Sequence, residues 1–572
     1  MANLIVVCTR QPTDSVLLGN VVRRCAAMLS PDNIRPHEPL VFERDRLAVV
    51  VANPVAGIPV HDGGVCLGRM FGPQEGWWVR GSEAPDGSFA IARHGAHAVE
   101  LVTDMLATRQ VWYVRTDDLF LASTSQRALV ALLGSFDLNR EAVTWMLTCG
   151  QLGGVSWDRR LHRLPGDCRL ALDRDSWELR VDQRPAVREP VLLSDAEHID
   201  RLREAIVETC ATLGLPMEEW LLPLSGGLDS RMLLLGLLSA GARPQCVTWG
   251  LKSSLSDPQN DAYIARELAD RLGVSFRYYH TDGWDESLDV SMRRFVQLSE
   301  GQATDFGAYT DGMAMWKGFF DDGVAGVIRG DEPGLGYYGR YDSEVQIRRQ
   351  QEITFLSDYP EEHPIRGLGL AEQRWNDSLQ RRQDESLARW NQRLVQEFFS
   401  PAVLAPLTVI KCAYVEVVNP MQTARVVRIA RELPDHLLVH RKPLAAVVRA
   451  LGPDIPFATH DAHPQSDVFS RPSFVAAVTA VLSAESAESV LSRPALDSIV
   501  SGLSRVTGAV STGRRWRHAV KAVVPKRLVD RIRPVWPVRL SGQDLAFRAS
   551  VAVQMVDILS RDARALDTKG IL

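Results

Sequence analysis

The sequence predicts a two-part α/β protein, with a mostly β region over residues 1–185 and a region over 186–572 built on a parallel sheet. In the first region, short apolar or alternating runs separated by Pro, Gly and Asp are typical of β-strands. In the second region, the stretch LLPLSGGLDS from Leu221 to Ser230 joins a buried apolar run to a glycine turn and a helical pattern. Apolar runs then alternate with amphipathic helical patterns, which predicts a parallel, doubly wound sheet.

The composition is that of an ordinary globular protein. The 572 residues are 45% hydrophobic and 24% charged, and the net charge of −5 indicates no nucleic-acid partner. The eight cysteines are scattered without a CxxC pair, which argues against a zinc site or a disulfide framework. No basic segment and apolar run of signal-peptide type opens the sequence, and no apolar stretch reaches membrane-spanning length. We therefore expect a cytoplasmic protein with no membrane partner.

Six short runs in the first region are expected to be strands: 4–8, 47–52, 88–92, 98–101, 111–114 and 119–122. Helical patterns interrupt them at Gln126–Leu133 and at 140–148, and a turn and a further strand are expected within 162–173. The alternating or apolar pattern of the runs and the punctuation between them favour a mostly β domain.

The segment PDGSFAIARHG, continuing to Gly134, resembles the second half of a class II glutaminase domain of the N-terminal-nucleophile type. The segment FDLNREAVTWM after it resembles the chain that leads out of that domain in asparagine synthetases. Such domains use a cysteine at position 2 as the nucleophile, but this sequence has Ala2, and Cys8 lies inside the first expected strand. A methyl group cannot attack an amide. We therefore expect residues 1–185 to be a glutaminase-like accessory domain without glutamine hydrolysis.

The glycine turn after Leu224 has the features of an anion site. A helix that begins directly after a glycine turn presents free backbone N–H groups and the positive end of its dipole to one point. Gly226 and Gly227 let a phosphate approach the backbone closely, and Ser225 and Ser230 add hydroxyl donors. The carboxylate of Asp229 would repel a phosphate unless a divalent cation lay between them.

SGGLDS resembles the pyrophosphate loop of the N-type ATP pyrophosphatases. The sequence here contains neither GxxxxGK[ST] nor GxGxxG. The resemblance implies that this loop grips the β and γ phosphates while ATP is cut between its α and β phosphates. An ordinary strand-to-helix turn is the alternative interpretation.

The elements around this loop complete the expected parallel sheet. A helix is predicted over 193–213 with Ser194 or Asp195 as its N-cap, strands over 244–249 and 274–279, and a helix at Asp261–Leu272. Ligands of such sheets bind at the carboxyl ends of the strands. Val247, Thr248 and Trp249 are therefore expected to flank the adenine of a bound nucleotide, although all three also suit plain core and loop positions.

A second acidic motif follows the apolar run 324–328, as Gly330, Asp331 and Glu332. It resembles a shortened SGEGADE segment of asparagine synthetases, which implies that Gly330 lies in the nucleotide site and that Asp331 holds Mg²⁺ together with Asp229. Two carboxylates at adjacent strand ends can hold Mg²⁺ against a triphosphate.

Residues 342–400 are strongly charged, and we expect a helical insert there with solvated faces. The sequence 413–436 resembles the LExRxPFLDxxLVExALxLP segment of the same family, with Glu416 at the glutamate. HRKPLAAVV matches the following segment and includes Lys442. Where the family carries a lysine facing the acyl-adenylate, this sequence reads IPFATHDAHPQ, and His460 is nearest. Glu416, Lys442 and His460 are thus the predicted catalytic residues.

The locally basic region 512–540 is expected to be either a solvated helical face or an attractor of an acidic partner or ATP.

These motifs together resemble the asparagine synthetase and β-lactam synthetase family, and most of all the lasso peptide macrolactam cyclases. The resemblance implies ATP and Mg²⁺ as cofactors and an acyl-adenylate intermediate. It also implies closure of an amide between an Asp or Glu side chain and the N-terminal amine of a precursor peptide, with a leader peptidase and a leader-recognition protein as partners. An ammonia-dependent or β-lactam synthetase-like ligase of small molecules is one alternative. A non-catalytic peptide-binding scaffold is another.

Overall fold

The computed structural model describes residues 3–54, 57–184, 191–281, 286–336, 343–462, 468–469, 471–506, 538 and 540–566. Ala2, the expected boundary at 185/186 and most of the basic region 512–540 lie outside these residues. The protein is a mixed α/β protein with two antiparallel sheets and one parallel sheet.

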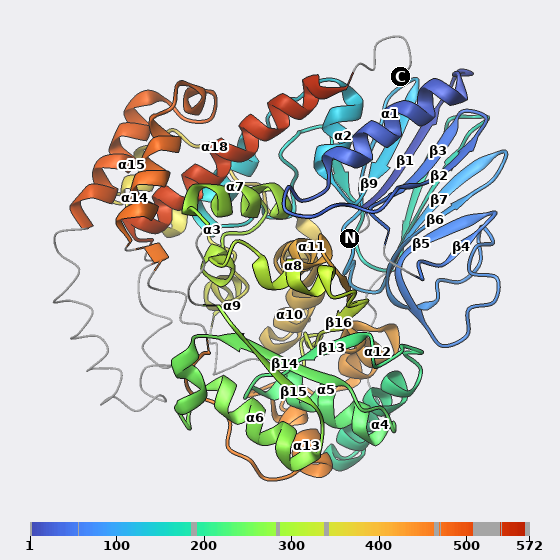
Figure 1. Ribbon diagram of the computed structural model, residues 1–572, viewed down its shortest axis with the longest axis vertical. Helices are drawn as coiled ribbons and strands as arrows, with labels where there is room; N and C mark the ends of the chain where they lie inside the picture. The colour runs from blue at the N-terminus through green and yellow to red at the C-terminus, as the bar shows by residue number, and fades with distance from the viewer. Residues whose placement is uncertain are drawn as a thin grey trace.

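Two six-stranded antiparallel sheets stack on one another in the first part of the chain (Figure 1). The strands of the first sheet are, in spatial order, β10 (His162–Arg163), β8 (Trp112–Arg115), β9 (Leu119–Ser123), β1 (Asn3–Thr9), β3 (Leu47–Ala52) and β2 (Leu40–Arg44). Those of the second are β12 (Leu179–Gln183), β11 (Cys168–Asp173), β7 (Ala98–Thr103), β6 (Asp86–His94), β5 (Gly64–Phe71) and β4 (Val60–His61). Each of the six predicted strand runs overlaps one observed strand, namely β1, β3, β6, β7, β8 or β9. The run predicted over 111–114 is displaced by one residue from β8.

The first sheet is buried on both faces, which explains why β1 and β3 read as continuous apolar runs. One face meets α1 (Ser15–Met28) and α2 (Gln126–Leu133), and the other meets apolar residues of β5 and β6. Helix α3 (Arg140–Cys149) follows α2, as predicted. Antiparallel strands with helices on their outer side thus form the first core.

The second part is organised on a five-stranded sheet in which every neighbouring pair is parallel. Its spatial order is β15 (Phe276–His280), β14 (Gln245–Gly250), β13 (Trp220–Pro223), β16 (Gly326–Ile328) and β17 (Glu416–Val418). From β13 the chain adds β14 and β15 on one side. It later adds β16 and β17 on the other side of β13. The order therefore reverses between β13 and β16, and open α/β sheets bind ligands at such a switch point.

Helices cover this sheet and supply its own apolar core. They are α4 (Asp195–Ala211), α5 (Leu228–Ser239), α6 (Asp261–Leu272), α12 (Ala424–Glu432) and α13 (Lys442–Leu451). The predicted N-cap is confirmed at α4, where Ser194 and Glu197 form a reciprocal capping box. Helix α6 has the predicted bounds.

A helical layer connects the two parts. It contains α7 (Leu288–Ser299), α8 (Ala314–Asp321), α14 (Pro472–Ser483), α15 (Arg493–Val506) and α18 (Gly542–Ala565). Helix α18 packs against α2, α3 and α7, and Figure 1 shows it beside α2. A buried ion pair between Arg127 Nε and Asp562 Oδ2, 2.8 Å apart, ties α18 to the first core.

The charged segment after residue 342 is less helical than its sequence pattern predicts. Helix α9 (Glu344–Gln350) is followed by irregular chain with three short 3₁₀ turns, η3 (Leu356–Asp358), η4 (Pro364–Gly367) and η5 (Asp377–Leu379). Prolines and glycines in this stretch interrupt the expected helical period. Regular helix returns only at α10 (Leu387–Leu394), which continues through the π-helix η6 (Val395–Leu404) into α11 (Ala405–Cys412).

The run Leu387–Cys412 is the one helix in the described chain that is long and apolar enough to cross a membrane, with a mean hydropathy of 1.2. However, 67% of that apolar window is buried inside the protein, so it is a core helix of this fold. Two short helical turns, η1 (Lys252–Ser256) and η2 (Phe306–Tyr309), precede it in the sequence, and η7 (Pro420–Gln422) and η9 (Glu485–Ser489) follow it.

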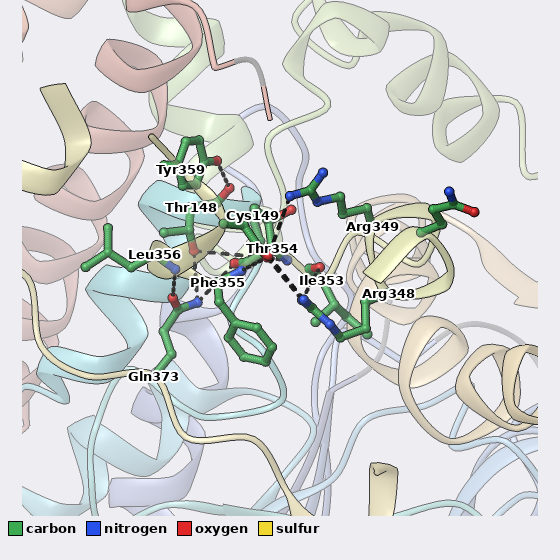
Figure 2. A network of polar contacts seen from close by, with 12 residues as sticks. Thr148, Cys149, Arg348, Arg349, Ile353, Thr354, Phe355, Leu356, Tyr359 and Gln373 are labelled. Carbon is green, nitrogen blue, oxygen red and sulfur yellow. Dashed lines mark hydrogen bonds and ion pairs between the residues drawn. The ribbon is translucent and has the colours of Figure 1, made fainter. Parts of the chain in front are cut away.

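A network of polar contacts fixes the irregular segment to α3 (Figure 2). The backbone of Thr354 donates to Cys149 Sγ at 3.2 Å, and that thiol donates back to the Thr354 carbonyl at 3.0 Å. Tyr359 donates its hydroxyl to the carbonyl of Thr148, and Gln373 donates to the Thr148 hydroxyl. The chain from Thr354 to Gln373 is therefore held against the first part of the protein.

Candidate functional site

A polar cavity of about 500 Å³ opens at the switch point of the parallel sheet. The loops after β13, β14 and β16 contribute to it, together with helix α11 and the chain near residue 461. Its polar and aromatic lining residues are Ser225, Asp229, Ser230, Thr248, Trp249, Asp261, Trp316, Arg329, Gly330, Asp331, Lys411 and Asp461. Motifs that lie about a hundred or more residues apart in sequence thus meet at one place.

The loop SGGLDS is folded around its two serine hydroxyls. The Ser225 and Ser230 oxygens lie 2.9 Å apart, and the Ser225 backbone N–H donates to Ser230 Oγ at 3.0 Å. Gly227 donates its N–H to Ser225 Oγ, and Gly226 donates to Asp261 Oδ1 at 3.1 Å. Helix α5 begins at Leu228 without a side-chain cap, so its first turn can offer N–H groups to an anion.

A buried arginine holds the chain that faces this loop. Arg231 donates to the carbonyls of Ile455 and Pro456, and its guanidinium lies 4.2 Å from the centre of the Phe457 ring. It also donates to the carbonyl of Gly226. The segment 455–458 is therefore fixed directly over the glycine turn.

Gly226→Ala is expected to destabilise the protein by about 1–3 kcal/mol, because overpacking forces backbone shifts. A Cβ at Gly226 would lie 2.4 Å from the Cβ of Ala458 and 3.0 Å from that of Ile264, neither of which can move aside as a flexible side-chain end. Urea unfolding measures the effect. Gly318→Ala in α8 is the matched control, since a Cβ there has no neighbour within 4 Å; equal stability of the two variants would contradict the close approach.

The two predicted metal ligands, Asp229 and Asp331, both line the cavity. Burial raises the pKa of the Asp229 carboxyl, and the charge of Asp331 raises it further, whereas Arg441 opposes both. Asp229 pairs with Arg441, and Asp331 pairs with Arg329 at 2.7 Å and accepts a hydrogen bond from Asn419 at 3.0 Å. The two carboxylates thus influence each other's charge, and each forms an ion pair with an arginine.

Within the described ranges, no group of three or more His, Cys, Asp and Glu side chains is placed to hold a metal ion. Two carboxylates beside serine hydroxyls still fit Mg²⁺, which commonly keeps several waters and takes oxygens from substrate phosphates. They do not fit a zinc site, which needs three or four protein ligands of the His or Cys type.

Lys411 reaches the same cavity from helix α11, and the sequence motifs did not indicate it. Its Nζ donates to the Leu407 carbonyl at 2.9 Å. Burial holds the pKa of Lys411 well below its ordinary value, and the nearby Arg329 lowers it further. A single lysine within an apolar helical run was the only signal in the sequence, and such a run does not say where the lysine points.

The residues predicted to flank adenine take different positions. Thr248 lines the cavity and donates its hydroxyl to the Leu224 carbonyl. Val247 is buried in β14, paired with Pro223, and belongs to the core. Next to Thr248, Trp249 contacts Trp316 edge to face with ring centres 5.7 Å apart, and both rings line the cavity.

Lys442 and His460 do not line the cavity. Lys442 begins α13 and donates to the carbonyl of His436, and the His460 ring pairs with Asp257 at 2.7 Å on the surface. The neighbour of His460, Asp461, does line the cavity. The cations at the site are Arg329, Lys411 and, through Asp229, Arg441.

Glu416 lies in β17 and forms a buried ion pair with Arg109 of the first part of the chain. Arg109 also donates to the carbonyl of Val417 at 3.0 Å. Glu416 is 1% exposed and does not line the cavity. In the structure it therefore connects the two parts of the chain and does not face the candidate site.

Glu416→Ala is expected to destabilise the protein by about 3–5 kcal/mol, because it leaves the guanidinium of Arg109 buried without its carboxylate. Denaturant unfolding of the variant measures this loss. The double variant Arg109→Met/Glu416→Met should recover most of it, since a buried pair can be replaced by apolar side chains. A Glu416→Gln protein with normal stability and no turnover would instead support the catalytic role that the sequence motif predicts.

Fold and site define a class: a two-part α/β protein that carries a polar, serine- and carboxylate-lined cavity at the switch point of a parallel sheet. No family model matches the sequence, and no curated protein matches it. A comparison with solved structures finds 23 matching chains. Among them is a glutamine phosphoribosylpyrophosphate (PRPP) amidotransferase from B. subtilis complexed with ADP and GMP. It is 8% identical with a TM-score of 0.20, and the match covers 48% of this chain and 65% of that enzyme. A likeness this weak carries no argument about function.

Proposed function

We propose that this protein forms amide bonds at the expense of ATP, through an acyl-adenylate, and releases AMP and pyrophosphate. The observation that supports this most is the meeting of the SGGLDS loop with Asp331 and Lys411 in one cavity of about 500 Å³. A cavity of this size can enclose most of a nucleotide. Its uncapped helix start favours phosphate, and its pair of carboxylates favours a divalent cation beside it.

In this proposal the SGGLDS loop binds the pyrophosphate part of ATP through its serine hydroxyls and the first amides of α5. Asp229 and Asp331 would hold Mg²⁺, which when bound neutralises phosphate charge. Trp249 and Trp316, which both line the cavity, would contact the adenine ring. Catalysis is then mainly positioning and charge stabilisation.

The reaction would proceed in two displacements. An oxygen of the substrate carboxylate attacks the α-phosphorus, the bond to the β-phosphate oxygen breaks, and pyrophosphate leaves. An amine then attacks the acyl carbon, the bond to AMP breaks, and the amine gives up a proton. We propose that Lys411 stabilises the negative charge that develops on the acyl-adenylate, in place of Lys442 or His460.

For the substrate, we propose a precursor peptide whose Asp or Glu side chain is joined to its own N-terminal amine, as in a lasso peptide macrolactam cyclase. A leader peptidase and a leader-recognition protein are the proposed partners. Residues 1–185 would then act as a glutaminase-like scaffold. A ligase of small molecules is the second candidate, favoured by the modest size of the cavity.

Incubation with ATP, Mg²⁺ and a candidate peptide tests this function. The expected products are AMP and a peptide lighter by one water. Production of ADP would contradict the proposal. AMP formation with a small carboxylic acid, but not with a peptide, would favour the second candidate.

A further inference from the structure

A second cavity, of about 650 Å³, lies apart from the candidate site and shares no lining residue with it. Residues 153–165 of the first part, the loop 374–382 and the π-helix η6 supply most of its lining, and Glu141 of α3 and Gln183 of β12 complete it. The lining holds three arginines, Arg163, Arg374 and Arg382, and three carboxylates, Glu141, Asp377 and Glu397. The loop 374–382 directly follows Gln373, which the network of Figure 2 fixes to α3.

Arg163 is a cation in this cavity without a counter-ion. It is partly buried, and within the described residues its side chain donates one hydrogen bond, from Nη1 to the Pro401 carbonyl at 3.1 Å. It forms no ion pair with any carboxylate in the described part of the chain. Burial lowers the pKa of Arg163 to about 10, so it stays charged at neutral pH. A guanidinium has five N–H donors, and a buried charge is costly unless it is paired.

A glycine in the backbone beside Arg163 leaves room for its guanidinium. A Cβ at Gly154 would lie 3.2 Å from Nη2 of Arg163, and Gly154 has a φ of +88°, a conformation that favours glycine. The guanidinium therefore faces the cavity across a glycine.

Aromatic side chains line one part of the same cavity. The rings of Trp375 and Phe398 lie 5.9 Å apart, and Phe355 packs edge to face on the other side of Trp375 at 5.7 Å. Trp375 is partly exposed and lines the cavity together with Phe398. A cation next to an aromatic wall suits a ligand that carries a carboxylate beside an apolar group.

A second hollow of about 360 Å³ adjoins this cavity at Arg382, which lines both. Arg431 lines this hollow and donates to Gln396 at 2.9 Å, again without a carboxylate partner among the described residues. The nearby Glu397 is already paired with Arg393 at 3.2 Å. Carboxylates also line the two hollows, but Arg163 in one and Arg431 in the other form no ion pair among the described residues. Two such arginines in separate hollows suit an extended chain with more than one carboxylate better than a compact nucleotide.

We propose that these two hollows form one groove that binds an acidic peptide segment, with a carboxylate on Arg163 and an apolar side chain against Trp375 and Phe398. As a site for the substrate peptide, the groove rests on the proposed function. Helix α10, the π-helix η6 and α11 run without a break from the groove to Lys411 in the candidate site, so one helix borders both.

Fluorescence anisotropy without ATP tests the groove, using a short fluorescein-labelled peptide rich in Glu and Phe and the same peptide with Gln for Glu. We expect salt-sensitive binding of the Glu peptide and at least about tenfold weaker binding of the Gln peptide. Arg163→Gln should weaken the Glu peptide similarly. The double variant Arg374→Gln/Arg382→Gln provides a second test at exposed positions, where folding is not at risk. Arg243→Gln, at an exposed position between α5 and β14 that lines neither hollow, should change nothing.

Failure of the Glu peptide to bind, equal binding of both peptides, or equal binding by the Arg374/Arg382 double variant would overturn the proposal. Equally strong competition by an RNA oligonucleotide would also overturn it, in favour of a general polyanion site. Because no nucleotide is present, absence of AMP formation in the enzyme assay leaves this result unaffected, and the two proposals can fail separately.

Discussion

Asp331→Asn is expected to lower AMP release at least about a hundredfold, as the loss of one preorganised charge at a reacting phosphate does. The change removes the negative charge that faces the phosphates with Asp229, but the amide can keep the hydrogen bond from Asn419. It also leaves Arg329 without its counter-ion at the cavity. Initial rates at saturating ATP and Mg²⁺ measure the effect.

The control for this prediction is Asp321→Asn, which removes a half-exposed carboxylate in α8, outside the cavity. It should leave the rate within about twofold, since surface ion pairs contribute little. Thermal unfolding checks that both variants fold. A correctly folded Asp331→Asn protein with a normal rate would remove Asp331 from the proposed cation site.

Lys411→Met is expected to lower AMP release about a hundredfold to a thousandfold, since it removes the buried cation nearest to the proposed acyl-adenylate. Methionine retains much of the buried volume, so the loss of rate does not come from a cavity. Because the pKa of Lys411 is held low by burial and by Arg329, entry of the ATP phosphates should raise it, and nucleotide binding should take up protons at pH values between the pKa of the free and of the bound protein.

Calorimetry of ATP binding in buffers of different ionisation enthalpy measures this proton uptake, which Lys411→Met should abolish. Lys317→Met, at an exposed lysine of α8, is the matched control and should change neither the uptake nor the rate. Normal turnover by Lys411→Met together with loss of turnover by Lys442→Met would restore the lysine predicted from the family motif.

The sequence predicted correctly the helices and turns whose ends depend on residues only a few positions away. The bounds of α2 and α6, the capping box of α4 and the turn after β13 all follow from spacing, caps and glycines within a few residues. The predicted parallel sheet is confirmed for the same reason, because buried strands and amphipathic helices alternate. The helical prediction for residues 342–400 is wrong mainly between α9 and α10, where prolines and glycines leave the charged chain irregular, and it is confirmed from Leu387 onward.

Contacts between distant segments could not be predicted in this way. The pairing of Glu416 with Arg109, of Asp229 with Arg441, and the entry of Lys411 into the cavity depend on how the two parts and the helical layer pack. No period or motif encodes which face of α11 meets the sheet. The sequence could therefore place the phosphate loop and Asp331 near each other, but it could not show that Lys411 of α11 joins them.

ATP–pyrophosphate exchange tests the central claim most directly, because it reports adenylation without needing the final amide. The protein is incubated with ATP, Mg²⁺, labelled pyrophosphate and a candidate peptide whose N-terminal amine is blocked. We expect label to enter ATP only when the peptide carries a free carboxylate, and not with Asp331→Asn. Carboxylate-dependent formation of ADP and phosphate, with no label in ATP, would contradict the account.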